Sequence, residues 1–403
     1  MNPSSNNPRA PGPAGTNLEQ AKWHNRRVII ETVRLHDRLT RAELARLTAL
    51  TPQTVSNITA ELQASGMLIA HDPLRAGRGQ PATPLSLNPD GAYSIGIQID
   101  HQSLTGLVVD LAGKVRARVV KNLRRPGPAA ALPAVQEMVQ QLFRQAKVDN
   151  QRMLGVGLVM PGPFGVEGIS SAGPTTLPGW EQVDVAAEVG RLVGLPAQLE
   201  NDANAAAIGE RLYGVAKTLQ NFAYLFVGTG LGAGLILEGR MFRGHAGNAG
   251  EAGHMIVVPG GRPCYCGNRG CLERYVSLDA AYETLGIIEA ERQTPQTLLD
   301  LGDGIDPWLN TAVTPLRQTI NVLETLLDLE TIVIGGTMPA AILQRLVDRL
   351  EPLPASLRSP LHRAPRLLVG AVGEDTAVLG AAALPIFAEF NPQYDALQKS
   401  IDS

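Results

Sequence analysis

The chain has 403 residues, of which 44% are hydrophobic and 18% charged, and its formal net charge is −3 at pH 7. This is the composition of a globular protein with room for two or three domains, and the small net charge excludes binding to nucleic acid through bulk positive charge. No apolar run is long enough to span a membrane, and the first residues lack the apolar core of a signal peptide. We therefore expect a cytoplasmic protein without a membrane partner.

The charge is distributed unevenly along the chain. Residues 1–90 hold ten Lys and Arg against seven Asp and Glu, whereas the remainder is acidic. The positive charge of the N-terminal part is expected of a module that binds nucleic acid and is joined to an acidic body. Within this region, residues 1–16 are rich in Pro, Asn and Ser, which predicts a disordered tail.

Residues 17–90 show the element order of a winged helix-turn-helix. Thr40 and Glu43 have the spacing of a capping box, and Thr51 followed by Pro52 marks the start of another helix. Two short apolar stretches then flank a basic Gly/Pro turn, which predicts a β-hairpin. The helices are expected over residues 17–37, 41–50 and 51–66.

The last of these helices carries short polar side chains at its start, and such side chains can read base edges in the major groove. The residues expected to contact DNA there are Gln53, Thr54, Ser56 and Asn57. In the wing, Arg75 and Arg78 are expected to enter the minor groove or bind phosphate. The alternative is a helix-turn-helix used for protein contact, with a solvated basic loop.

Beyond a boundary at Asn88–Gly91, strands alternate with helices for about 300 residues, which predicts an α/β body of two lobes. Strands are expected over residues 93–100, 105–110, 114–122, 153–160, 222–227, 233–237 and 331–334, and helices over 132–147 and 307–329. The expected organisation is a tail (1–16), a winged helix-turn-helix (17–90), a two-lobed domain (91–388) and a C-terminal tail (389–403).

All three cysteines of the chain lie within eight residues, at Cys264, Cys266 and Cys271. The glycines between them let the backbone bend tightly, and the nearest plausible fourth ligand is His254. Zn²⁺ prefers four such ligands in a tetrahedron, so we predict a structural zinc site. The alternatives are three unconnected small hydrophobic residues or a labile disulfide.

A second polar group follows an apolar, strand-like segment. Asn201 and Asp202 offer an amide and a carboxylate side by side, which suits sugar hydroxyls because both accept from O–H groups. They also suit the cap of the Ala-rich helix that follows, and the residues alone favour capping.

The run from Gly250 to His254, followed by Cys264-x-Cys266-Gly267-x-x-Gly270-Cys271-x-Glu273, resembles the signature of the ROK family of repressors, open reading frames and kinases. The resemblance extends from about residue 20 to about residue 388. It implies an α/β fold in which an N-terminal winged helix-turn-helix precedes a two-lobed, actin/hexokinase-like (ribonuclease H-like) ROK domain.

The resemblance also implies roles for individual residues. The zinc ligands it implies are His254, Cys264, Cys266 and Cys271. The sugar-binding residues it implies are Asn201, Asp202, Glu251, His254 and Glu273, with Asp202 at the position of the general base in family kinases. Segments 161–163 and 177–180 resemble the family's sugar cleft. Thr176 stands where the family commonly has Asn, which leaves the sugar's identity open among xylose, glucose and N-acetylated sugars.

A kinase of this family needs a phosphate loop of the form D-x-G-G-T, whose glycines let the backbone approach the phosphates. The matching residues here are Asp100-His101-Gln102-Ser103-Leu104, without either glycine or the threonine. The second loop, Gly228–Gly232, is intact, and the adenosine-side turn Gly335–Thr337 is partly so.

We therefore predict a sugar-responsive regulator similar to ROK repressors of the xylose or N-acetylglucosamine type. It would have no catalytic residues, and Asp202 would be a vestigial base. The expected partners are operator DNA, a small sugar and further copies of the chain in a homodimer or tetramer. The alternatives are an ATP-dependent sugar kinase with an added N-terminal domain, and a regulator controlled by a protein partner.

Overall fold

The computed structural model describes residues 18–73, 82–161, 177–180, 182–288, 294–358 and 364–392. They form two compact units, one made of Met1–Gly91 with Phe387–Ser403 and the other of Ala92–Ile386. The N-terminal tail, Arg75, Arg78 and Thr176 lie outside the described residues.

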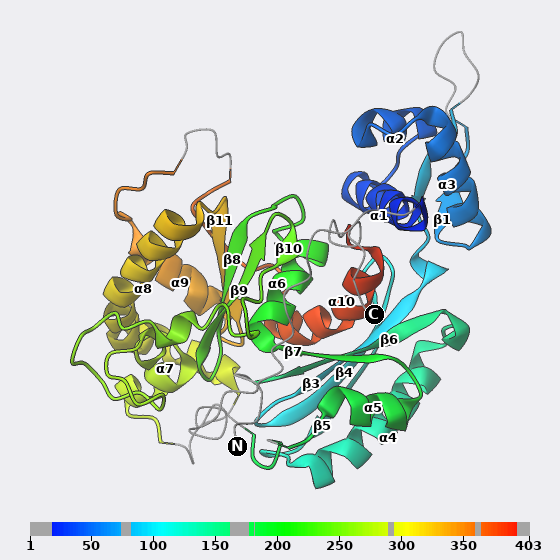
Figure 1. The fold of residues 1–403 in the computed structure, drawn as a ribbon. Coiled ribbons are helices and arrows are strands. Elements are labelled where there is room, and N and C mark those ends of the chain that lie inside the picture. The colour runs from blue at the N-terminus through cyan, green and yellow to red at the C-terminus, as the bar shows by residue number, and fades with distance from the viewer. Residues whose placement is uncertain are drawn as a thin grey trace, which may run out of the picture. The chain divides into compact units, whose positions relative to one another are not determined.

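The first unit contains three helices and a two-stranded sheet (Figure 1). The Thr40 side chain accepts from the backbone N–H of Glu43, whose carboxylate accepts from that of Thr40, so the expected capping box is confirmed. Thr51 caps the next helix by accepting from the N–H of Thr54, again as expected. The elements are α1 (Leu18–His36), α2 (Arg41–Thr48), α3 (Pro52–Ala64), β1 (Leu68–Ala70) and β2 (Leu85–Leu87), and the two strands are antiparallel.

The core of this unit consists of apolar side chains from all three helices and from β2. Ile29, Val33, Leu44, Val55, Leu62 and Leu85 have no exposed surface. The last turn of α10 (Thr376–Phe390) also belongs to this unit. There the Arg27 guanidinium donates to the backbone carbonyls of Ala388 (3.1 Å) and Glu389 (2.8 Å), so it caps carbonyls that have no partner within their own helix.

The second unit is built on two five-stranded sheets. The first has the order β5-β4-β3-β6-β7, in which β3, β4 and β5 form the expected antiparallel meander and β6 and β7 run parallel to β3. Helices α4 (Pro128–Ala146) and α5 (Val185–Val193) pack on it. The strands are β3 (Tyr93–Ile99), β4 (Ser103–Asp110), β5 (Val115–Asn122), β6 (Met153–Met160) and β7 (Ala197–Asn201).

The second sheet has the order β10-β9-β8-β11-β12. Its core is formed with α7 (Leu278–Leu285), α8 (Asp306–Leu327) and α9 (Ala340–Leu350), and Trp308 is the largest fully buried side chain. The strands are β8 (Phe222–Val227), β9 (Leu231–Leu237), β10 (Arg240–Met241), β11 (Thr331–Gly336) and β12 (Leu367–Val369).

Helices α6 (Asp202–Tyr213) and α10 pack together with residues of both sheets. Their small side chains allow close approach, and a Cβ at Gly380 would overlap the carbonyl oxygen of Ala205. Helix α6 is therefore held rigidly, with its first residue, Asp202, at the end of β7. None of the helices in the described ranges is both long and apolar enough to cross a membrane.

Candidate functional site

A pocket in the second unit is lined by residues from both sheets, with about 80 Å³ of space that water can enter. A space of this size holds several water molecules. All five residues expected to bind a sugar line this one pocket, although 72 positions separate the first from the last. Its charged and amide side chains, with the histidines, are Gln98, Asp100, His101, Asn201, Asp202, Glu251, His254 and Glu273.

Asn201 and Asp202 combine helix capping with a place in the pocket wall. Asn201 Oδ1 accepts from the backbone N–H of Asn204 at 2.7 Å, so the capping role suggested by the residues alone is present. Asp202 Oδ1 accepts from the N–H of Ala203 at 2.9 Å. Burial raises the pKa of Asp202 to about 7, and the negative charges of Asp100 and Glu251 add to the shift. A carboxyl group with this pKa both donates and accepts hydrogen bonds near neutral pH.

Glu251, His254 and Glu273 form a second part of the lining. His254 Nε2 lies 3.9 Å from Glu251 Oε2, and its Nδ1 lies 3.5 Å from Glu273 Oε1. Burial raises the pKa of Glu251, the charge of His254 lowers it, and the charge of Glu273 raises it again. Glu273, which is 8% exposed, accepts from the Cys264 thiol at 2.9 Å. The acidic pocket and the cysteine cluster thus share a wall.

The cysteine cluster has the geometry of a metal site. The ligand atoms of His254, Cys264, Cys266 and Cys271 all lie within 4.8 Å of one another. Cys264 Sγ is 3.6 Å from His254 Nδ1, and the Sγ atoms of Cys266 and Cys271 are also 3.6 Å apart. A tetrahedron with Zn–S bonds of about 2.3 Å has edges of about 3.8 Å. The four residues can therefore hold a metal ion, and all three cysteines are free thiols.

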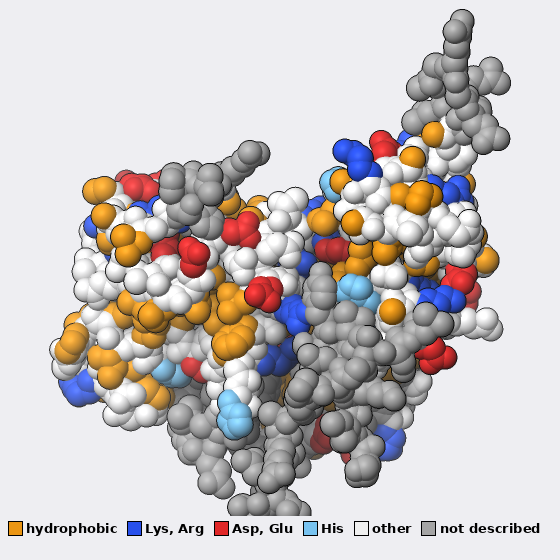
Figure 2. Space-filling view, turned by 45° about the horizontal axis from the view of Figure 1, so that its top comes forward, with side chains coloured by type: hydrophobic (Ala, Val, Ile, Leu, Met, Phe, Trp, Pro, Cys, Tyr) orange, Lys and Arg blue, Asp and Glu red, His pale blue; other side chains and the backbone are white. Residues whose placement is uncertain are grey.

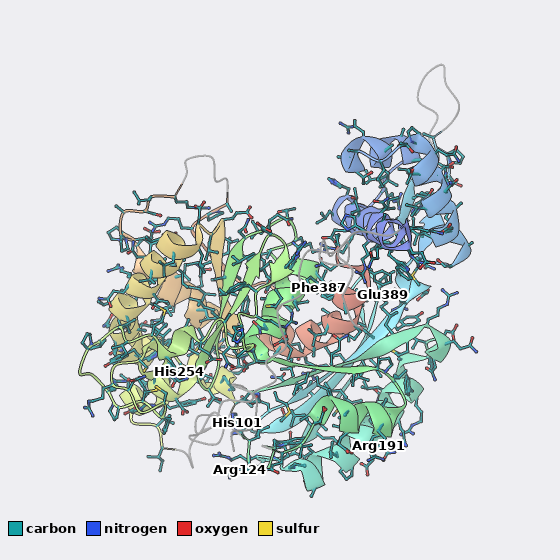
Figure 3. The ribbon with its side chains drawn as sticks, viewed as in Figure 1. His101, Arg124, Arg191, His254, Phe387 and Glu389 are labelled. Carbon is teal, nitrogen blue, oxygen red and sulfur yellow. The ribbon has the colours of Figure 1, made fainter. Side chains whose placement is uncertain are left out.

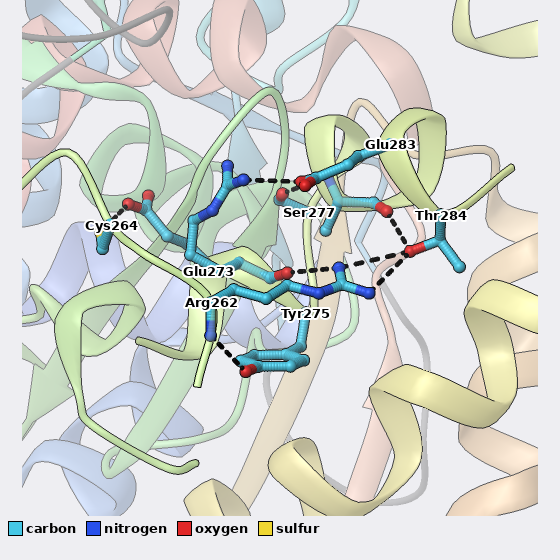
Figure 4. Close-up of polar contacts among 9 residues, drawn as sticks. Arg262, Cys264, Glu273, Tyr275, Ser277, Glu283 and Thr284 are labelled. Atoms are coloured by element: carbon cyan, nitrogen blue, oxygen red, sulfur yellow. Dashed lines mark hydrogen bonds and ion pairs between the residues drawn. The ribbon is translucent and has the colours of Figure 1, made fainter. Parts of the chain in front are cut away.

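The loop that carries these cysteines is anchored through Arg262, as Figure 4 shows. The Arg262 guanidinium donates to the carbonyl of Arg274 (2.9 Å) and to the Thr284 hydroxyl on α7 (3.3 Å). Its backbone N–H donates to the Tyr275 hydroxyl at 3.0 Å, and its guanidinium lies over the Tyr275 ring. The loop thus has anchors besides a metal ion.

The turn between β3 and β4 begins the segment Asp100–Leu104, which was expected to correspond to a D-x-G-G-T phosphate loop. Asp100 N–H donates to the Ser103 carbonyl at 2.9 Å, which closes a tight turn, and β4 begins at Ser103, two residues earlier than expected. His101 N–H donates to Asp100 Oδ1 at 2.7 Å. Leu104 is fully buried within the strand. The N–H groups of Asp100 and His101 are thus used inside the turn.

The glycines of the two other loops have structural roles. A Cβ at Gly228 would come within 2.7 Å of the Phe226 ring, and one at Gly335 would overlap the Tyr224 hydroxyl. The Gly228 carbonyl also accepts from Leu278 N–H at the start of α7, at 2.8 Å. Packing therefore accounts for Gly228 and Gly335.

In the first unit, the start of α3 presents the polar side chains expected to read DNA. Gln53, Ser56 and Asn57 are exposed and Thr54 is half-buried, while Val55 and Ile58 face the core. Gln53 Nε2 donates to Asn57 Oδ1 at 2.9 Å. On the face drawn in Figure 2, Lys and Arg are interspersed with Asp and Glu among the residues in colour.

Comparison with known proteins settles the family. The model of the ROK family matches residues 94–386. The chain belongs to the ROK family. Among its relatives, the xylose repressor of Bacillus subtilis (strain 168) is 26% identical over 376 residues, which cover 90% of this chain and 94% of the repressor.

Two solved ROK structures confirm the fold expected from the sequence. A ROK transcriptional regulator, described as a homologue of the E. coli Mlc protein, aligns with a TM-score of 0.72 and 22% identity over 94% of this chain and 99% of its own. The ROK hexokinase of Thermus thermophilus aligns with a TM-score of 0.57 and 27% identity over 72% of this chain and 97% of its own. The fold is thus that of a ROK domain preceded by a winged helix-turn-helix.

Several residues that support the ROK site were not expected from the sequence. Glu200 Oε1 accepts from the Asn204 amide at 2.9 Å, and Glu200 Oε2 accepts from Arg243 at 2.8 Å. The four-residue spacing of Glu200 and Asn204 across the start of a helix is the sequence feature that could have indicated their contact. The anchoring role of Arg262 had no comparable local signal.

Proposed function

We propose that this ROK protein is a sugar-responsive transcriptional regulator, most simply a repressor of carbohydrate-utilisation genes. One combination carries the proposal: a helix-turn-helix with an exposed polar recognition helix shares the chain with an acidic pocket. Beside that pocket, the segment Asp100–Leu104 lacks both glycines and the threonine of a phosphate loop. The name of the xylose repressor among its relatives supports this function.

In this proposal residues 17–90 bind DNA and residues 91–388 bind the sugar. The sugar hydroxyls would be held by Asn201, Asp202, Glu251, His254 and Glu273. Carboxylates accept hydrogen bonds from O–H groups, and the Asn201 amide both donates and accepts. A homodimer or tetramer would present paired recognition helices to a pseudo-palindromic operator. Gln53, Thr54, Ser56 and Asn57 would contact base edges, and the wing residues Arg75 and Arg78 would contact the minor groove or phosphate.

A structural Zn²⁺ would be held by His254, Cys264, Cys266 and Cys271, because three thiolates and one imidazole are a typical zinc ligand set. His254 Nδ1 faces the cysteines, so the metal would fix the ring with Nε2 as the nitrogen left for the pocket. The ion would thus orient a sugar-binding group without taking part in a reaction.

DNA binding can be tested on the full-length protein. Duplexes selected by the protein from a random pool would be labelled, and their affinity measured by fluorescence anisotropy at several salt concentrations. Asn57→Ala should weaken binding about tenfold or more, the usual loss for one base contact. The matched control is Asn150→Ala, an exposed asparagine of the second unit. Equal losses for the two variants, or no selectable duplex at all, would contradict the proposal.

The alternative function is an ATP-dependent sugar kinase. One observation favours it: a pKa of about 7 at Asp202 is suited to a general base at neutral pH. The sequence of the turn argues against it, since Asp100–Leu104 lacks both glycines and the threonine of a D-x-G-G-T phosphate loop. Incubation with ATP and a panel of sugars should give no sugar phosphate. Turnover that disappears in Asp202→Asn would establish the kinase instead.

A further inference from the structure

The described side chains that line the pocket are acidic as a set, and none of them carries a permanent positive charge. Asp100, Asp202, Glu251 and Glu273 line it, and among the described lining residues none is Lys or Arg. The segment 162–176 follows the lining residue Pro161, and its sequence contains one Glu and no Lys or Arg. Wherever that segment lies, it adds no cation to the pocket.

The carboxylates of the pocket act on one another. The pKa of Asp202 is raised first by burial and then by the charges of Asp100 and Glu251, which line the same pocket. A phosphate or carboxylate on a ligand would add to this repulsion in a partly desolvated site. A hydroxyl group donates to the carboxylates, and an ammonium group also offsets their charge. The pocket therefore favours ligands that carry O–H or N–H₃⁺ groups and disfavours anions.

His101 stands at the variable second position of the D-x-G-G-T pattern. Its ring lines the pocket, and its Nε2 is buried without a hydrogen-bond partner among the described residues. Burial lowers the pKa of His101. The charges of Asp100 and Asp279 oppose this shift, whereas the charge of Arg125 adds to it. The ring is therefore neutral at pH 7, with one nitrogen donating and the other accepting. Arg125 is close enough to act on His101, but it does not line the pocket.

A buried polar atom without a hydrogen-bond partner calls for an explanation. Because His101 Nε2 belongs to a side chain that lines a pocket, a hydrogen bond to a bound ligand is such an explanation. Figure 3 shows His101 and His254 on different parts of the second unit, and both line this pocket. A sugar held by Glu251, His254 and Glu273 would therefore share this pocket with the imidazole of His101.

We propose that His101 is a sugar-contacting, specificity-determining residue, and that the pocket accepts uncharged or amine-bearing sugars and rejects their phosphorylated forms. This inference rests on the proposed sugar-responsive function. It implies that the protein responds to a sugar before any phosphorylation of that sugar.

Matched sugars test the charge selectivity on the full-length protein. Thermal unfolding and calorimetric titration would compare glucose, glucosamine and glucose 6-phosphate, N-acetylglucosamine and its 6-phosphate, and xylose. A ligand that binds only the folded state raises its melting temperature. At least one uncharged or amine-bearing sugar should bind, and its phosphorylated form should bind at least tenfold more weakly. A phosphorylated form that binds as tightly as its parent would overturn the inference, yet leave the regulatory function standing if it also releases DNA. Binding by none of the sugars would contradict both.

Substitution of His101 tests the contact itself. His101→Ala should weaken the affinity for the sugar that binds best by about three- to tenfold, which is the contribution of one hydrogen bond. His101→Gln should recover part of this loss. Gln102→Ala is the matched control, because Gln102 is an exposed neighbour in the same turn and does not line the pocket. The melting temperature of each sugar-free variant shows whether it folds. A folded His101→Ala protein with unchanged sugar affinity would remove His101 from the contact set.

Discussion

At the scale of single residues, Asp202 shows how environment overrides position. A carboxylate at the start of a helix normally has a lowered pKa, because the free N–H groups and the helix dipole stabilise its charge. Asp202 begins α6 and does accept from Ala203 N–H. Burial and the charges of Asp100 and Glu251 nevertheless dominate, and the pKa rises to about 7. The charge of this group therefore depends on pH within the physiological range.

This shift makes the stability of the folded chain pH-dependent. The pKa of Asp202 is higher in the folded than in the unfolded chain, so between about pH 4 and pH 7 the folded state binds more protons at this site. Its contribution to stability therefore falls as pH rises through that window. Asp202→Asn, which removes the titration, should gain in melting temperature relative to the parent as pH is raised from 4 to 8.

Glu188→Gln is the control for this measurement, because Glu188 is an exposed carboxylate on α5 that forms a salt bridge with Arg191. A difference between Asp202→Asn and the parent that is constant from pH 4 to pH 8 would show that the carboxyl is not perturbed.

At the scale of elements, the cysteine loop joins the metal site to the pocket wall. Glu273 contacts Cys264, and His254 belongs to both sites. Displacement of a metal ion would therefore disturb two of the expected sugar contacts, even though Arg262 keeps the loop attached to α7.

The shared wall of the metal site and the pocket predicts what removal of the metal does. Elemental analysis should find about one Zn²⁺ per chain. A chelator should lower the melting temperature and weaken sugar binding, and added Zn²⁺ should restore both whereas Mg²⁺ should not, since Mg²⁺ prefers oxygen ligands. A metal-free chain with unchanged stability and sugar affinity would exclude a structural ion.

The close contact between α6 and α10 depends on the absence of a side chain at Gly380. Gly380→Ala would place a methyl group against the Ala205 carbonyl, so the helices would have to move apart. Overpacking of this kind costs about 1–3 kcal/mol of unfolding free energy, which denaturant titration can measure. Gly304→Ala should have a small effect, because a Cβ there meets only Leu301 at an ordinary 3.5 Å. Equal effects of the two substitutions would contradict this account.

The sequence predicted elements where local pattern reflects local structure. The starts of α2 and α3 follow from Thr40 and Thr51, and the meander β3–β5 follows from its apolar strands. Helix α10 was not predicted, because it is apolar on nearly all sides, contains Pro385 and has no 3.6-residue pattern. The ROK resemblance named the pocket carboxylates, but the side chain of His101 in the pocket wall depends on long-range packing.

At the scale of the whole molecule, the proposed function requires that sugar and DNA affect each other's affinity equally. If saturating sugar weakens operator binding by some factor, saturating operator must weaken sugar binding by the same factor. Calorimetric titration of the sugar with and without the selected duplex measures this factor, and anisotropy with and without sugar measures it independently. Asn57→Ala should retain sugar affinity in the absence of DNA. Sugar binding that is indifferent to the duplex would separate the two units functionally.

The last turn of α10 also limits how the first unit can be isolated. A fragment ending at Gly91 would lack Ala388 and Glu389, whose carbonyls are the partners of Arg27. Such a fragment would expose a guanidinium and the surface that the helix covers. A better fragment would join residues 387–392 to the N-terminus of residues 18–91 through a flexible linker, so that both segments of the chain that build this unit are supplied together.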